Sequence, residues 1–260
     1  MLKLVPSYKK RKDISCIAVL VSFNTYDWIV PCLKKFRKHF PDMDILVVDN
    51  NPCQGTKRSK TFVGKTVYCT PFTWNKKREE EREWLHSVKD SMNLQIIQTP
   101  RCMDHGRAID FAISTISGYD AFVHIEPDCS VNGKAWMRNL KQKIVDGNWT
   151  SSGCMKSSRE MHPTPSIWRL DVWKYLELSF VAFSRKVYTG QERLFYQMFD
   201  LYRMDSAAQG CWDTGIYASY RCARKGRSSY ANTQDLHHAW CGSKRNNPSK
   251  SERSLLQKLY

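Results

Sequence analysis

Long apolar runs are missing from this chain of 260 residues. No stretch approaches the roughly 18 to 20 residues that a membrane-spanning helix needs. The basic segment 9–12 and the apolar segment 14–23 superficially resemble a signal peptide, but no small-x-small cleavage pattern follows them. A buried strand that ends in a polar loop is therefore the better interpretation of this region.

Paired cysteines are also missing. The chain has 10 cysteines but no Cys-x-x-Cys pair, so a zinc site built from such pairs is not expected. Several cysteines stand within apolar stretches, where a free thiol behaves as a small hydrophobic side chain. Because a disulfide framework is typical of short secreted chains, these scattered cysteines predict a reducing compartment and a cytoplasmic, intracellular protein.

Acidic residues are few, since 25 Asp and Glu stand against 41 Lys and Arg, which gives a net charge of +16. This surplus predicts an anionic partner, either a nucleotide, a nucleic acid or a membrane surface. A non-enzymatic nucleic-acid-binding module is one alternative, although no helix-turn-helix, zinc-finger or RNP-like pattern supports it. A nucleotidyltransferase is another, although residues 22–26 lack the Gly-rich, Lys/Arg-containing loop typical of that class.

Strand and helix patterns alternate in the first half of the chain. Residues 14–21 form a β-branched run typical of a strand covered on both faces, and residues 44–49 form a second strand. Between them, apolar residues at helical spacing predict an amphipathic helix over 28–40. The result is a βαβ unit, which implies a parallel sheet.

The next elements continue this alternation. The charged segment 71–93 is predicted to be a surface helix with no functional role. A strand at 94–97, a helix at 106–117 and a strand at 120–125 follow. In the second half the periodicity weakens, and helices are expected at 171–178, 191–204 and 211–224. No linker is visible, so residues 1–260 are expected to form one α/β domain.

Polar residues follow three of the predicted strands. They lie at 22–24, at 49–51 and at 126–128, and in open α/β sheets ligands bind outside the carboxyl ends of the strands. Glu126 and Asp128 flank a proline directly after an apolar strand, and such oxygen donors suit Mg²⁺ or Mn²⁺. The alternative is a strand-terminating turn whose acids face water.

The order of these parts resembles the family 2 glycosyltransferases of the GT-A fold. Members of that family have a first strand that ends near Asn, a second that ends in Asp, a helix that begins His/Ala-Gly/Arg-x-Ala and a strand that ends in an Asp-x-Asp-type metal motif. The corresponding parts here are Asn24, Asp49, residues 105–112 and residues 126–128. The resemblance implies a Rossmann-like, mixed and mostly parallel sheet flanked by helices.

The resemblance also implies roles for the residues at these positions. A nucleotide sugar would be bound by Asn24, Asp49, His105, Arg107 and Glu126, although a position on the helix surface is an equal alternative for Arg107. Glu126 departs from the usual first Asp and is one methylene longer. It is therefore expected to reach the ribose, or the metal through a water, which leaves Asp128 as the metal ligand for Mn²⁺ or Mg²⁺.

Two further residues in the second half match the family pattern. Asp213, in the segment 212–215, resembles the catalytic carboxylate that removes a proton from the acceptor hydroxyl. A helix N-cap is the alternative role for Asp213. His238 resembles the late histidine that completes the metal shell, with His237 as the other candidate and a packed or surface histidine as the alternative.

Together these correspondences imply a metal-dependent, inverting glycosyltransferase with a nucleotide-sugar half at 14–130, an acceptor half at 131–242 and a basic tail at 243–260. Because both ends of the chain are basic, the acceptor is expected to be a polyanion. DNA with a hydroxymethylated base, as modified by the glycosyltransferases of some bacteriophages, is favoured. A lipid-linked or cell-surface glycan and a basic surface without acceptor role are the alternatives.

Overall fold

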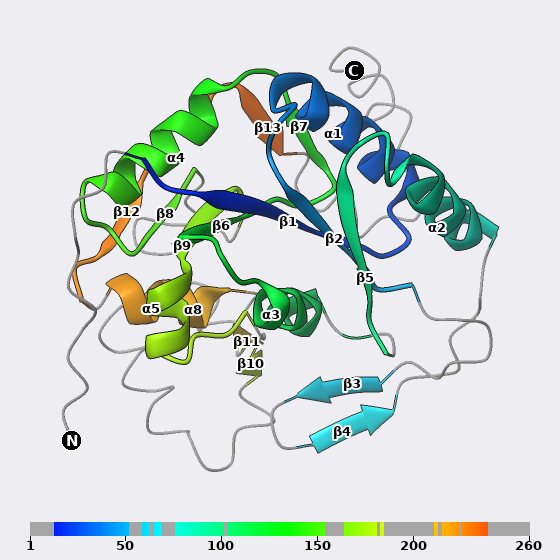
Figure 1. Cartoon of the computed structure of the whole chain (residues 1–260). Helices are drawn as coiled ribbons and strands as arrows, with labels where there is room; N and C mark the ends of the chain where they lie inside the picture. Colours follow the sequence, from blue (N-terminus) through cyan, green and yellow to red (C-terminus); the bar gives the residue numbers. More distant parts are fainter. Residues whose placement is uncertain are drawn as a thin grey trace.

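A mixed, seven-stranded sheet organises the described part of the chain (Figure 1). The computed structural model describes residues 13–51, 59–62, 65–68, 76–100, 103, 105–153, 164–180, 183–184, 211–212, 215–223 and 225–238. The strand order is β12-β8-β9-β6-β1-β2-β5. The strands are β1 (Cys16–Ser22), β2 (Ile45–Asp49), β5 (Leu94–Gln98), β6 (Ala121–His124), β8 (Thr150–Ser152), β9 (Ser166–Arg169) and β12 (Ser228–Tyr230).

Only β9 runs against its neighbours in this sheet. It pairs antiparallel with β6 and β8, whereas β5, β2, β1 and β6 form a parallel block and β12 pairs parallel with β8. The predicted mixed, mostly parallel α/β sheet is therefore confirmed. Strands from both halves of the sequence contribute to it, because β8, β9 and β12 follow residue 145.

Helices cover both faces of the sheet (Figure 1). One face carries α1 (Tyr26–His39), α2 (Lys76–Val88) and α4 (Ala135–Val145), and the other carries α3 (His105–Thr115), α5 (Leu170–Tyr175) and α8 (Ile216–Ala223). Every residue of β1 is buried, as a strand with apolar side chains toward both faces requires. Within the described residues, no helix combines the length and the apolar character that crossing a bilayer demands.

Short two-stranded pairings complete the described structure. They are β3 (Ser59–Phe62) with β4 (Lys65–Tyr68), β7 (Cys129–Val131) with β13 (Leu236–His238), and β10 (Phe183–Ser184) with β11 (Cys211–Trp212). The prediction of one helix over 211–224 was wrong at its start, because Cys211 and Trp212 are in β11. The helix begins only after Gly215, whose φ of 79° lies outside the helical region. The predicted helix 191–204 lies outside the described residues.

The order of the strands reverses at β1. The chain first builds β2 and β5 on one side of β1 and then returns to add β6 on the other side. Such a reversal opens a crevice outside the carboxyl ends of the two central strands, where ligands bind in open α/β sheets. Here those ends are Ser22 of β1 and His124 of β6, so residues 22–24 and 125–128 follow the two central strands at this edge.

A late segment of the chain caps the first turn of α4. Asp235 accepts hydrogen bonds from the backbone N–H groups of Ala135 (2.6 Å) and Trp136 (2.8 Å), although it lies 100 residues from Ala135. Lys134 at the N-cap position forms no side-chain cap of its own. A Cβ atom on Gly133 would come within 2.5 Å of the Asp235 carboxylate, so this approach needs a glycine. The cap keeps β13 beside β7, next to the end of β6.

Candidate active site at the carboxyl edge of the sheet

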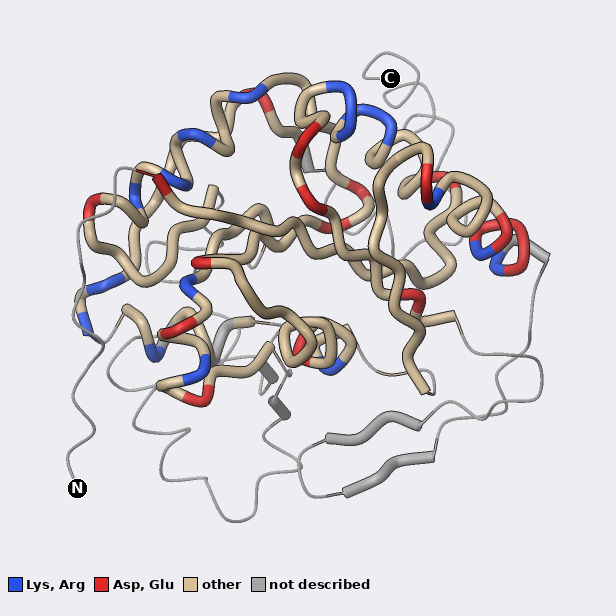
Figure 2. The backbone as a smooth tube through the Cα atoms, viewed as in Figure 1, with Lys and Arg blue, Asp and Glu red and all other residues tan. Residues whose placement is uncertain are grey.

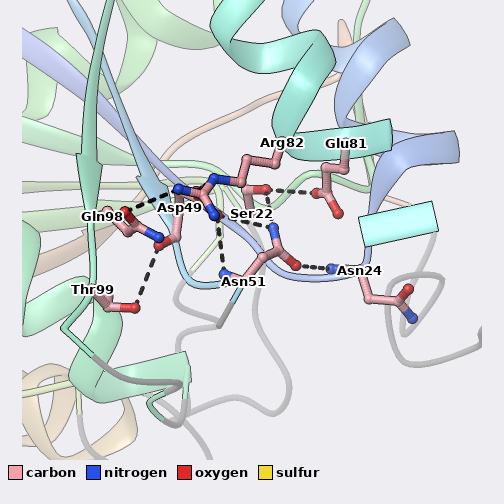
Figure 3. A network of polar contacts seen from close by, with 8 residues as sticks. All are labelled: Ser22, Asn24, Asp49, Asn51, Glu81, Arg82, Gln98 and Thr99. Carbon is pink, nitrogen blue, oxygen red and sulfur yellow. Dashed lines mark hydrogen bonds and ion pairs between the residues drawn. The ribbon is translucent and has the colours of Figure 1, made fainter. Parts of the chain in front are cut away.

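Asn51 links the carboxyl ends of β1 and β2 (Figure 3). Its side-chain Nδ2 donates to Ser22 Oγ (3.1 Å) and to Asp49 Oδ1 (3.1 Å), and its backbone N–H donates to the same Asp49 oxygen (3.1 Å). Its Oδ1 accepts from the backbone N–H of Asn24 (3.0 Å), which has a φ of 55°. The structure thus brings together Asn24 and Asp49, which the sequence predicted to share a binding site.

Asp49 is almost fully buried, with 1% of its surface exposed. Oδ1 is satisfied by Asn51, whereas Oδ2 accepts no hydrogen bond and instead lies 3.5 Å from Nε of Arg82. Arg82 also donates through Nη2 to Gln98 Oε1 (3.3 Å) at the end of β5. A buried carboxylate oxygen that forms an ion pair but no hydrogen bond can still accept a hydrogen bond, for example from an N–H or O–H group of a ligand.

Helix α2 contributes to this edge, contrary to the prediction that it has no functional role. Glu81 is fully buried and accepts three hydrogen bonds, from Ser22 Oγ (2.7 Å), Thr25 Oγ1 (2.6 Å) and the Thr25 backbone N–H (2.8 Å). The Arg78 guanidinium lies 4.6 Å from the centre of the Phe23 ring. Helical spacing in the sequence could have predicted this contribution, because residues 78, 81, 82 and 85 share one helical face and Leu85 on that face is buried.

Burial raises the pKa of Glu81 above its ordinary value. The hydrogen bonds from Thr25 and Ser22 oppose this effect because they favour the charged form, and the nearby charge of Asp49 adds to it. The Glu81 carboxylate in α2 therefore feels the charge of Asp49 at the end of β2.

Asn50 connects β2 to the segment that precedes α3. Its Oδ1 accepts from Thr99 Oγ1 (3.0 Å) and from the backbone N–H of Met103 (2.9 Å), while its Nδ2 donates to the Met103 carbonyl (2.9 Å). These contacts hold Met103 two residues before α3, which begins at His105. Arg107 is half-buried in the first turn of the same helix.

The end of β6 carries the second group of predicted site residues. His105 Nδ1 lies 3.9 Å from Glu126 Oε1, and the His105 ring is 5.6 Å from the buried His124 ring, measured between centres. The Glu126 backbone N–H donates to Thr164 Oγ1 (2.9 Å). The structure therefore brings together Glu126 and His105, two of the residues that the family resemblance assigns to nucleotide-sugar binding.

Asp128 is buried, with 1% of its surface exposed. Burial raises the pKa of the Cys32 and Cys129 thiols, and the negative charge of Asp128 raises both further. β13 pairs with β7 so that the Cα of His238 lies opposite that of Cys129, the residue after Asp128. The backbone of His238 is therefore one residue along the chain from the position opposite Asp128, whereas His237 pairs with Ser130.

The donor set at this edge fits a hard divalent cation. Glu126 and Asp128 offer carboxylate oxygens, which suit Mn²⁺ and Mg²⁺, and His238 carries an imidazole, which a borderline ion such as Mn²⁺ accepts beside carboxylates. Among the described side chains no three metal-ligating groups converge; the side chain of His238 is outside that set. Asp213 lies outside the described residues.

Comparisons with solved structures find weak likenesses. A mannosyltransferase of Pyrobaculum calidifontis, PcManGT, solved with GDP-Man and Mn²⁺, is 8% identical over 67% of this chain and 50% of its own, with a TM-score of 0.49. The glycosyltransferase GlyE of Streptococcus pneumoniae is 10% identical over 83% of this chain and 45% of its own, with a TM-score of 0.45.

TarS of S. aureus, solved in complex with UDP-GlcNAc, is 12% identical over 65% of this chain and 49% of its own, with a TM-score of 0.46. The present chain spans about half the length of these structures. No protein-family model and no curated protein sequence matches it.

Proposed function

We propose that this protein is a GT-A-type glycosyltransferase that moves a sugar from a nucleotide-diphosphate donor to an acceptor hydroxyl. The observation that carries the proposal is that two groups of polar residues follow neighbouring strands at the edge where the strand order reverses. On one side of β1, Asn24 and Asp49 are joined through Asn51. On the other side of β1, Glu126 and Asp128 come after β6. This is where open α/β sheets bind nucleotides.

The donor would lie along this edge. Asp49 has capacity at Oδ2 for an N–H or O–H donor of the nucleoside, and the Asn24 turn borders the same space. Glu126 and His105, 3.9 Å apart, would contact the ribose or the sugar. Arg107 in the first turn of α3 would add positive charge near the diphosphate.

Asp128, with Glu126 and His238 beside it, would hold Mn²⁺ or Mg²⁺. Such an ion neutralises the negative charge of the departing diphosphate when it is bound. Asp128 is buried, and the pairing of β13 with β7, with the Cα of His238 opposite that of Cys129, supports His238 as the imidazole ligand.

Asp213 is proposed as the general base. It would accept the proton of the acceptor hydroxyl as that oxygen forms a bond to the anomeric carbon. The bond from this carbon to the diphosphate breaks, and the nucleotide diphosphate leaves with the electron pair. A single displacement of this kind inverts the configuration at the anomeric carbon.

A polyanionic acceptor is supported by basic residues along two neighbouring helices, whose Lys and Arg positions are blue in Figure 2. Lys34 and Lys38 of α1 and Lys134 and Arg138 of α4 are exposed, and the helices contact each other where Phe40 packs on Trp136 with rings 5.7 Å apart. These cations suit phosphodiesters, so DNA with a hydroxymethylated base, as in bacteriophages, is the proposed acceptor. A lipid-linked or cell-surface glycan is the alternative.

A cytoplasmic location is proposed from the buried free thiols.

A thermal-shift screen tests the activity class. UDP, GDP and their sugar conjugates are added with and without Mn²⁺. A ligand at a hundredfold its Kd stabilises by about 2.7 kcal/mol, which raises Tm by roughly 5 to 10 °C. Asp128→Ala is expected to abolish the metal-dependent part of the shift. If no nucleotide raises Tm while plain duplex DNA does, the non-enzymatic nucleic-acid-binding alternative is correct.

A further inference from the structure

Helix α2 places charged side chains where folding alone would favour apolar ones. Along its inward face, Leu85 is fully buried in the core, but one turn earlier the fully buried residue is Glu81. Burying a carboxylate costs free energy that a leucine at the same position avoids. Departures of this kind from ordinary packing are expected at functional sites.

Thr25 departs from an ordinary role at the same place. It occupies the N-cap of α1, where threonine commonly accepts a hydrogen bond from the first turn of its own helix, yet it makes no such bond. Its hydroxyl instead donates to Glu81 at 2.6 Å, and its backbone N–H donates to Glu81 at 2.8 Å. The turn between β1 and α1 is therefore tied to α2.

The hydrogen bonds that connect Glu81, Ser22 and Asn51 have a fixed direction. Ser22 has one hydroxyl hydrogen, and it points to Glu81 Oε1 at 2.7 Å. Ser22 Oγ can then only accept from Asn51, so Nδ2 of Asn51 faces Ser22 and Oδ1 faces the Asn24 N–H. In this orientation Nδ2 also donates to Asp49 Oδ1 and leaves Oδ2 for another donor (Figure 3).

We propose that Glu81 is a positioning residue that fixes the Asn51 amide through Ser22 and thereby orients the Asp49 carboxylate for a nucleoside. The nucleoside part of this inference rests on the proposed function. Glu81 itself does not touch the donor, because its two carboxylate oxygens already accept three hydrogen bonds, from Ser22 and Thr25.

The test compares Glu81→Gln with Glu83→Gln, a matched control that removes the same charge from an exposed position on the same helix. The Gln variant keeps the volume, but its amide cannot accept from both Thr25 N–H and the two hydroxyls. Ser22→Ala is the second variant, because it breaks the connection to Asn51 while leaving Glu81 bonded to Thr25.

Two measurements are made on each variant. Hydrogen exchange followed by NMR reports the Asn51 and Thr25 amides without any ligand. Isothermal titration with UDP and with GDP, each with Mn²⁺, reports affinity. We expect Glu81→Gln and Ser22→Ala each to speed Asn51 exchange and to weaken nucleotide binding about tenfold, as loss of one hydrogen bond near a charge does. The double variant should be no weaker than either single one, and Glu83→Gln should match wild type.

Folded Glu81→Gln and Ser22→Ala with wild-type Asn51 exchange and wild-type affinity would overturn the proposal. Additive losses in the double variant would also overturn it, because Glu81 would then act by another route than Ser22. A wild-type protein that binds neither nucleotide refutes the proposed function. In that case faster Asn51 exchange in both variants still supports the role of Glu81 in fixing Asn51.

Discussion

Replacing Asp235 by alanine tests whether α4 depends on a cap from a distant part of the chain. The substitution removes the acceptor of two backbone hydrogen bonds, from Ala135 and Trp136. Loss of an N-cap side chain costs about 0.5 to 2 kcal/mol, and loss of a negative charge at a helix N-terminus costs about 0.3 to 1 kcal/mol more. We therefore expect the free energy of unfolding to fall by about 2 kcal/mol and Tm to fall by about 4 to 8 °C.

Asp146→Ala is the matched control for this experiment. Asp146 is exposed at the other end of α4, where its side chain accepts a hydrogen bond from Gln142 Nε2 (2.8 Å). Its removal should change stability by less than about 0.5 kcal/mol. Thermal and urea denaturation, followed by circular dichroism, measure both variants. If Asp235→Ala unfolds within 1 °C or so of wild type, the cap does not stabilise the helix and the reasoning fails.

Three other outcomes follow from packing, burial and charge. Gly153→Ala should lower Tm, because its Cβ would lie 2.2 Å from Thr233 Cγ2, and Thr233→Gly in the same chain should restore part of the loss. Burial raises the pKa of Glu81 above its ordinary 4.5, so the folded state holds this proton more tightly than the unfolded state. The stability of wild type relative to Glu81→Gln should then fall as pH rises from 4.5, and urea titrations that show a constant difference would contradict this. Brief alkylation of the native protein should leave four buried thiols unmodified, as measured by mass spectrometry. Protein unfolded in urea should react at all four. Labelling of these thiols in the native state would refute their burial. These thiols are Cys16, Cys32, Cys129 and Cys222.

The parallel block of the sheet could be predicted from the sequence because each strand carries its own signal. The run over 14–21 predicted β1, which extends from Cys16 to Ser22, and the strand predicted at 44–49 is β2, Ile45–Asp49. Burial on both faces requires an unbroken apolar segment, and such a segment is visible without knowledge of its neighbours. The same signal placed Asp49 and Glu126 at strand ends.

The polar contacts around these strands were harder to predict. Helical spacing on α2 was readable, but a charged face suggests solvent unless the buried Leu85 on the same face is noticed. The cap from Asp235 joins residues 100 positions apart, and no local sequence pattern predicts a contact between such distant residues. Asn51, which binds Ser22, Asn24 and Asp49, looked like an ordinary turn residue.

The cap from Asp235 also affects how the protein is made. A ribosome that adds about 5 to 20 residues per second completes α4 roughly 5 to 20 seconds before it reaches Asp235. During that interval the first turn of α4 and the edge of β7 lack the partners that they have in the finished fold. Assembly around Asp128 is therefore a late event in synthesis, and nascent chains stalled before residue 235 should be more sensitive to protease at α4 than chains stalled well beyond residue 238.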